Sequence, residues 1–96
     1  MEQTVASVSL AVHEKLELKK NRLSPLSGND KGKRICVVTG VHGDELEGQY
    51  VVYLLNRKIQ AHPELLTGTV DIYPAINPLG INTIQRGIPL FDLDMN

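Results

Sequence analysis

The stretch "RICVVTGVHGDELEG", residues 34–48, decides the fold of this chain. Its first part, Arg34 to Thr39, is a short β-branched run, which is typical of a strand covered on both faces. A glycine-containing loop follows and leads into residues 46–61, where apolar side chains recur at helical spacing. Acidic residues stand at the start of this segment, and Arg57 and Lys58 stand near its end, which complements a helix dipole. The stretch therefore predicts a strand, a tight loop and a helix in succession.

The helix and the segment after it predict a βαβ unit. The expected buried face of the helix comprises Leu46, Tyr50, Val51, Leu54, Leu55 and Ile59. The helix should end at His62, because the residue before a proline is disfavoured in helical geometry. Residues 69–76 supply a second strand, in which Pro74 indicates either an edge position or an irregular strand end. The two strands of such a unit are parallel and its crossover is right-handed.

The N-terminal part of the chain predicts a β-hairpin. Apolar and polar residues alternate over residues 4–12, with Val12 on the apolar side, as in a half-buried strand. A turn at residues 13–15 should return the chain antiparallel. The predicted fold is α/β: an antiparallel hairpin over residues 1–24, an exposed loop over residues 25–33, and a βαβ unit of a mixed sheet over residues 34–96.

Composition indicates an ordinary globular domain. The 96 residues allow one domain at most, and 42% hydrophobic with 22% charged residues is a normal balance. A net charge of -1 favours neither a nucleic-acid partner nor a membrane partner. The N-terminus lacks the basic-then-apolar pattern of a secretory signal, so we expect a cytoplasmic protein. The single cysteine, Cys36, lies in an apolar strand and is expected in the core.

The predicted topology brings two polar loops together. The loops that leave parallel strands emerge at one carboxyl edge of the sheet, where ligand sites are built. The loop 41–45 and the segment from Asn77 onward should therefore share this rim. The isolated pattern His-x-x-Glu, here His42 and Glu45, more often reflects a capped helix with a locally bonded histidine. Its place at a strand-to-helix junction instead favours two of the three protein ligands that a catalytic zinc takes.

Two motifs resemble a known family. "GVHGDELEG", residues 40–48, resembles the first zinc-ligand motif of the succinylglutamate desuccinylase/aspartoacylase family, within the zinc carboxypeptidase-like hydrolases. "NPLGINTIQRG" and "FDLDMN", residues 77–87 and 91–96, resemble its second motif, an Asn-Pro, an arginine and then Asp-Leu-Asn-Arg. The resemblance covers residues 34–96 and implies the zinc carboxypeptidase-like fold. The hairpin is similar to that of the family's bacterial deacylase-like branch.

The resemblance implies a role for individual residues. His42 and Glu45 match the first two ligands of the family's Zn2+ cofactor. Arg86 matches the catalytic arginine that binds and polarises the scissile carbonyl and stabilises the oxyanion. Asn96 matches the asparagine that holds a substrate carboxylate, and Asp94 belongs to the same substrate-binding motif in a supporting role.

The resemblance also implies a function. The expected activity is zinc-dependent deacylation of an N-acyl amino acid or a similar small amide. The family's third zinc ligand and its acid/base glutamate would follow Asn96, so we expect the N-terminal part of one catalytic domain, inactive alone and prone to homodimerise or pair strand edges. Two alternatives stay open: a zinc carboxypeptidase that cuts a peptide or γ-glutamyl bond, and a non-catalytic binding or assembly domain of the same fold.

Overall fold

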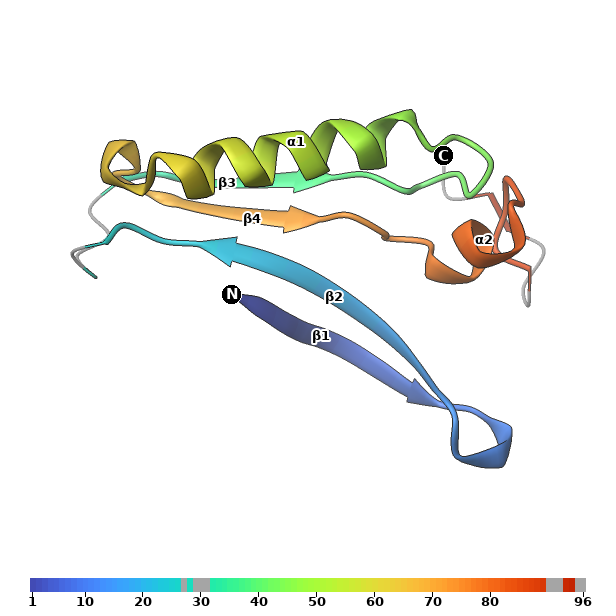
Figure 1. Cartoon of the computed structure of the whole chain (residues 1–96). Helices are drawn as coiled ribbons and strands as arrows, with labels where there is room; N and C mark the ends of the chain where they lie inside the picture. Colours follow the sequence, from blue (N-terminus) through green and yellow to red (C-terminus); the bar gives the residue numbers. More distant parts are fainter. Residues whose placement is uncertain (27, 29–31, 90–92, 95–96) are drawn as a thin grey trace.

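The computed structural model describes residues 1–26, 28, 32–89 and 93–94 of the chain. Within these residues, four strands form one mixed sheet in the spatial order β1-β2-β4-β3. The elements are β1 (Glu2–Ser9), β2 (Lys15–Leu23), β3 (Arg34–Val38), α1 (Glu47–Ala61), β4 (Thr69–Tyr73) and α2 (Pro78–Thr83). α1 runs alongside β3 and β4, whereas α2 lies beyond the end of β4 (Figure 1). In the described part of the chain, no helix is long and apolar enough to cross a membrane.

The strand directions confirm the predicted fold class. β1 pairs antiparallel with β2, β2 pairs antiparallel with β4, and β3 pairs parallel with β4. The strand before Pro74 is not at an edge, because β4 lies between β2 and β3. The other expectation, an irregular strand end, is confirmed. β4 stops at Tyr73, since proline lacks the N–H that a further ladder bond needs.

The hairpin turns earlier than the sequence pattern predicts. β1 ends at Ser9, and Ala11–His13 form a 3₁₀ turn closed by the bond from the Leu10 N–H to the Glu14 carbonyl at 2.8 Å. Val12 sits at the turn with a positive φ of 54° and is exposed, so its expected place on the buried side of a strand is wrong. Alternation marks a strand but does not show where the chain reverses.

The buried face of α1 also differs from the prediction. Val52, only 3% exposed, packs with Leu23 and Ile72, and Leu55 and Ile59 pack partly buried around this cluster. Four of the residues expected on the buried face are exposed instead: Leu46, Tyr50, Val51 and Leu54. The apolar side chains of the helix thus fall into two groups. In the described structure the sheet covers the group of Val52, Leu55 and Ile59, and it leaves Tyr50, Val51 and Leu54 exposed. The helix itself begins at Glu47, one residue later than predicted.

The prediction that β3 is covered on both faces is wrong for the described residues. β3 is the last strand of the sheet, and Ile35, Val38 and Cys36 are all exposed. The expected core position of Cys36 is therefore wrong as well. A continuous apolar run predicts a strand correctly, but the neighbours that cover it depend on the sheet order.

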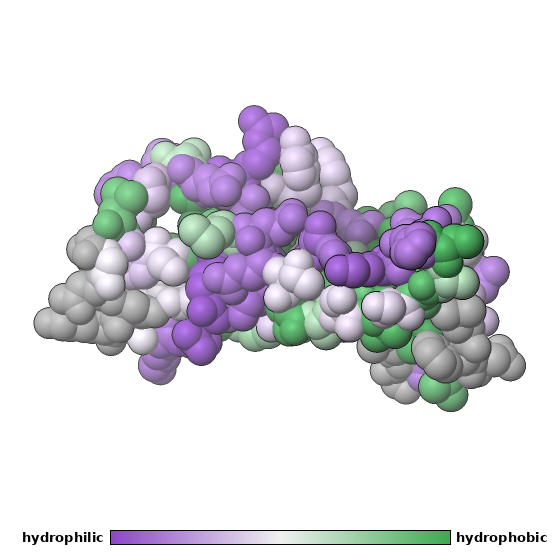
Figure 2. Space-filling view, turned by 90° about the horizontal axis from the view of Figure 1, so that it is seen from below, coloured by the Kyte–Doolittle hydropathy of each residue, from purple (hydrophilic) through white to green (hydrophobic). Residues whose placement is uncertain are grey.

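A buried ion cluster ties the hairpin to the βαβ unit. Asp71 of β4 is 5% exposed and accepts a bidentate pair of bonds from Arg22 of β2, at 2.8 Å from Nε and 3.0 Å from Nη2. Lys20 Nζ lies 3.5 Å from the same carboxylate. Bidentate, charge-assisted bonds are stronger than neutral ones. In contrast, Lys19 pairs with two acidic side chains in solvent. The face of the molecule seen in Figure 2 is largely hydrophilic in its middle.

The Arg22–Asp71 pair predicts an acid-sensitive stability. The Arg22 guanidinium lowers the pKa of Asp71 against the opposing effect of burial. A lowered folded-state pKa stabilises the fold above the unfolded aspartate pKa of about 3.9, and this stability is lost as the pH falls below that value. In the full-length protein, Arg22→Ala should reduce the free energy of unfolding at pH 7 by about 3 kcal/mol and flatten its decline in acid.

Urea denaturation of both proteins at pH 7 and at lower pH measures this effect. Lys19→Ala, which removes exposed ion pairs on the same strand, is the matched control and should leave the stability nearly unchanged. An equally steep acid decline in Arg22→Ala and in the unmodified protein would contradict the assignment.

Candidate active site

The two loops that leave β3 and β4 join at one end of the sheet, as predicted. The Thr39 N–H donates to the Tyr73 carbonyl at 2.9 Å, and the Ile76 N–H donates back to the Thr39 carbonyl at 3.1 Å. The Asn77 N–H then bonds the Gly40 carbonyl at 3.0 Å. These bonds continue the parallel pairing past the strand ends, so residues 41–45 and the segment from Asn77 lie on the same rim.

His42 and Glu45 face each other on this rim. His42 is 9% exposed, and its Nδ1 lies 2.7 Å from Oε2 of Glu45, whose side chain is exposed. The Glu45 N–H bonds the His42 carbonyl at 3.2 Å, which forms the turn that brings the two side chains together. Neither Asp44 nor Glu45 caps α1, because the N-cap is Leu46 and makes no side-chain cap bond. A helix-capping role therefore does not explain the pair.

The second imidazole nitrogen contacts the second motif. His42 Nε2 lies 2.8 Å from Oδ1 of Asp94, and the other oxygen of Asp94 accepts a 3.0 Å bond from Nε of Arg86. Glu45, His42, Asp94 and Arg86 thus form one continuous chain of contacts across two loops. Of the residues predicted for the site, only Asn96 lies outside the described residues.

The electrostatics of the site centre on the imidazole. Asp94, and then Glu45, raise the pKa of His42 by hydrogen bonding, while burial and the Arg86 charge oppose them. A histidine that binds metal commonly donates its other ring N–H to a carboxylate, which orients the ring. With Asp94 at Nε2, the atoms left to face a cation are Nδ1 and the Glu45 carboxylate. This nitrogen and oxygen pair suits zinc.

The described residues do not form a metal site by themselves. Among them, no group of three or more His, Cys, Asp or Glu side chains is arranged to hold a metal ion. The imidazole nitrogen of His42 and the carboxylate of Glu45 are donor types that bind zinc, and a site built on them would need a further donor.

Asn77 belongs to the second motif, but no role in the site was predicted for it from the sequence. Asn77 is 2% exposed, and its amide donates to the carbonyls of Val41 at 3.2 Å and Gly87 at 2.9 Å. Its Oδ1 accepts the Gly80 N–H at 3.0 Å and so caps α2. An asparagine before a proline is a readable helix-start signal. The two donated bonds, however, carry no sequence signal.

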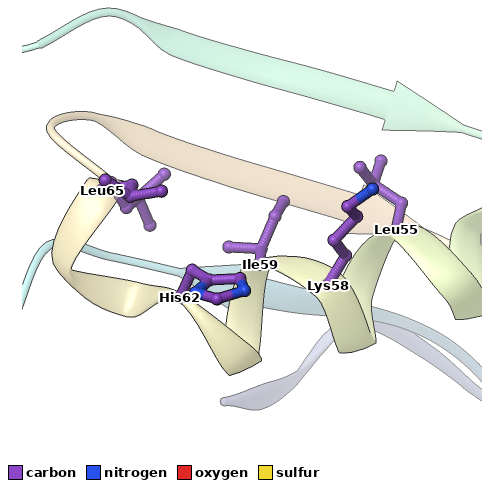
Figure 3. Close-up of a pocket in the computed structure, with 6 residues that line it drawn as sticks. Leu55, Lys58, Ile59, His62 and Leu65 are labelled. Atoms are coloured by element: carbon purple, nitrogen blue, oxygen red, sulfur yellow. The ribbon is translucent and has the colours of Figure 1, made fainter.

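A hollow at the other end of α1 is separate from this site. It has a volume of about 290 Å³. Its lining is mostly aliphatic and comprises Leu55, Lys58, Ile59, His62, Leu65 and Leu66 (Figure 3). It lies at the C-terminal end of the helix, whereas His42 precedes the N-terminal end.

A comparison with models of protein families identifies the family of this chain. Residues 31–96 match the model of the succinylglutamate desuccinylase/aspartoacylase catalytic domain, which is more than half of the chain. The chain belongs to this family. No curated protein matches it.

Solved structures of family members share the fold. A succinylglutamate desuccinylase/aspartoacylase from Rhodobacter sphaeroides is 28% identical with a TM-score of 0.77, over 99% of this chain and 29% of that one. A family protein from Shewanella amazonensis is 32% identical with a TM-score of 0.70, over 98% and 26% of the two chains. An aspartoacylase family protein from Mesorhizobium loti is 27% identical with a TM-score of 0.73, over 92% and 26%. The chain thus spans less than a third of these family members.

Proposed function

We propose that the full-length protein is a zinc-dependent hydrolase that removes the acyl group from an N-acyl amino acid or a similar small amide. One observation carries the proposal: a buried imidazole holds one carboxylate at each nitrogen, and the second carboxylate also holds an arginine. Membership in a family of desuccinylases and aspartoacylases supports the reaction class.

In this proposal, His42 Nδ1 and Glu45 hold the zinc ion. Asp94 would accept a hydrogen bond from Nε2–H and so favour the tautomer in which Nδ1 is free to act as a ligand. A catalytic zinc supplies Lewis-acid chemistry, polarising a carbonyl and making water acidic enough to attack at neutral pH. The family resemblance implies a histidine as the third ligand.

Arg86 stabilises the negative charge that develops on the carbonyl oxygen of the substrate. Asp94 holds the guanidinium through Nε, which is compatible with the terminal nitrogens binding a substrate oxygen. Such preorganised donors stabilise a transition state more than a substrate, because they face the charge where it develops. Asn96 would bind the carboxylate of the amino acid. Asp94 would have a supporting role, because it contacts both His42 and Arg86 and would hold them in place.

Metal removal from the full-length protein tests the function. Hydrolysis of N-acetyl and N-succinyl amino acids should fall by about tenfold or more after chelation and return with added zinc. Dipeptides and γ-glutamyl amides serve as competing substrates. Zinc-dependent cleavage of these alone would indicate a carboxypeptidase, and zinc-loaded protein without hydrolysis of any of them would indicate a non-catalytic domain.

A further inference from the structure

Asn77 is the least exposed of the buried polar residues in the described structure, at 2%. It follows β4 and lies between the two loops of the candidate site. A side-chain amide at this depth needs partners for its donors and its acceptor, because an unpaired buried polar group is destabilising.

Its partners connect the two loops directly. One bond of the Asn77 amide goes to the carbonyl of Val41, the residue before His42. The other goes to the carbonyl of Gly87, the residue after Arg86. One planar amide therefore contacts the backbone beside a proposed metal ligand and the backbone beside the proposed catalytic arginine.

The backbone packs closely beside this amide. A Cβ added at Gly43 would lie 2.0 Å from backbone atoms of Gly80, and one added at Gly80 would lie 2.4 Å from Nδ2 of Asn77. The loop of His42 thus packs against the backbone of α2, with Asn77 beside this contact. In such close packing, a displaced amide must displace the loops, because the interior has no room to absorb the change.

We propose that Asn77 is a positioning residue, which fixes the separation between the loop of His42 and Glu45 and the loop of Arg86. The proposal rests on the proposed function for its catalytic consequence, since a small misplacement of reacting groups lowers turnover by about 100-fold. Its structural consequence, the coupling of the two loops, does not depend on that function.

A role limited to capping α2 is the competing explanation, and Asn77→Asp separates the two. Aspartate caps helices as well as asparagine does, so the bond from the Gly80 N–H is kept. It has no N–H donors, so it loses both donated bonds and places an oxygen against the Val41 and Gly87 carbonyls. Asn77→Ser is a second variant that also keeps a capping oxygen, without burying a charge. Asn82→Asp, at an exposed position of α2, is the matched control.

Hydrogen exchange of the full-length variants gives the first readout and requires no enzymatic activity. With Asn77→Asp or Asn77→Ser, amides in residues 40–46 and 84–89 should both exchange about tenfold faster or more, while Asn82→Asp matches the unmodified protein. If a folded Asn77 variant shows unchanged hydrogen exchange in both segments, the proposal is overturned. Asn77 would then serve only as the N-cap of α2.

Kinetics give the second readout. Asn77→Asp should lower kcat by about 100-fold with little change in KM when zinc is supplied in excess. If Asn77 acts through the placement of Arg86, the double variant with Arg86→Ala should lose little more than Arg86→Ala alone. Additive losses would contradict the placement of Arg86 by Asn77. If the unmodified protein shows no hydrolysis, the proposed function fails and the hydrogen-exchange result still decides whether Asn77 couples the loops.

Discussion

Replacing His42 with alanine in the full-length protein is expected to remove nearly all bound zinc and to abolish amide hydrolysis. The imidazole supplies the nitrogen of the proposed pair of zinc ligands, His42 and Glu45. Its other nitrogen contacts Asp94, so the substitution also removes the link between Asp94 and the proposed zinc ligands. Loss of a partner that only orients a ligand already reduces metal affinity or activity by about 10–100-fold. Loss of the ligand itself should therefore exceed that range.

Zinc content after dialysis and the initial rate of deacylation measure this effect. His62→Ala is the matched control, because His62 is an exposed histidine at the other end of α1. It should leave zinc content and rate unchanged. A His42→Ala protein with full zinc and full activity would remove His42 from the site.

Replacing Arg86 with alanine should lower kcat by about 100- to 1000-fold while zinc content stays the same. The guanidinium contacts Asp94 rather than His42 or Glu45, so its removal takes away charge stabilisation without removing a proposed ligand. Arg57→Ala is the matched control, since Arg57 is exposed on α1 and contacts Tyr53. Equal losses in both variants, or a loss of zinc in Arg86→Ala, would contradict the role assigned to Arg86.

Local sequence patterns predicted the elements of the fold well. The apolar run of β3, the helical periodicity of α1 and the breaks at Pro63 and Pro74 are set by residues close together in the chain. The parallel pairing of β3 and β4 followed from the order of the elements. That pairing and the two motifs together predicted that His42, Asp94 and Arg86 meet at one rim.

Burial was predicted less well, because it depends on which neighbours cover each face. Tyr50 and Val51 are apolar residues of the same helix, yet they are exposed, whereas Val52 is buried against the sheet. Cys36 lies in an apolar run, but its strand is the last of the described sheet. Pattern alone does not distinguish a covered apolar face from an open one.

Long-range polar partners were not predictable from the sequence either. Arg22 and Asp71 are 49 residues apart, and the lysines and arginine of β2 have the composition of an ordinary solvated strand. The helix cap at Asn77 can be predicted from the neighbouring sequence. Its bonds to Val41 and Gly87 cannot, because they form only when two loops come together in the folded chain. The expected pairing of exposed strand edges between copies stays a prediction.

The central claim is that the His42 ring presents Nδ1 to a zinc ion shared with Glu45, while Nε2 is held by Asp94. Anomalous diffraction at the zinc edge from crystals of the full-length protein tests it most directly. We predict one strong zinc peak bonded to Nδ1 of His42 and to the Glu45 carboxylate, with the Nε2–Asp94 contact kept. A zinc peak remote from His42, or one bonded to Nε2 in place of Asp94, would contradict the account.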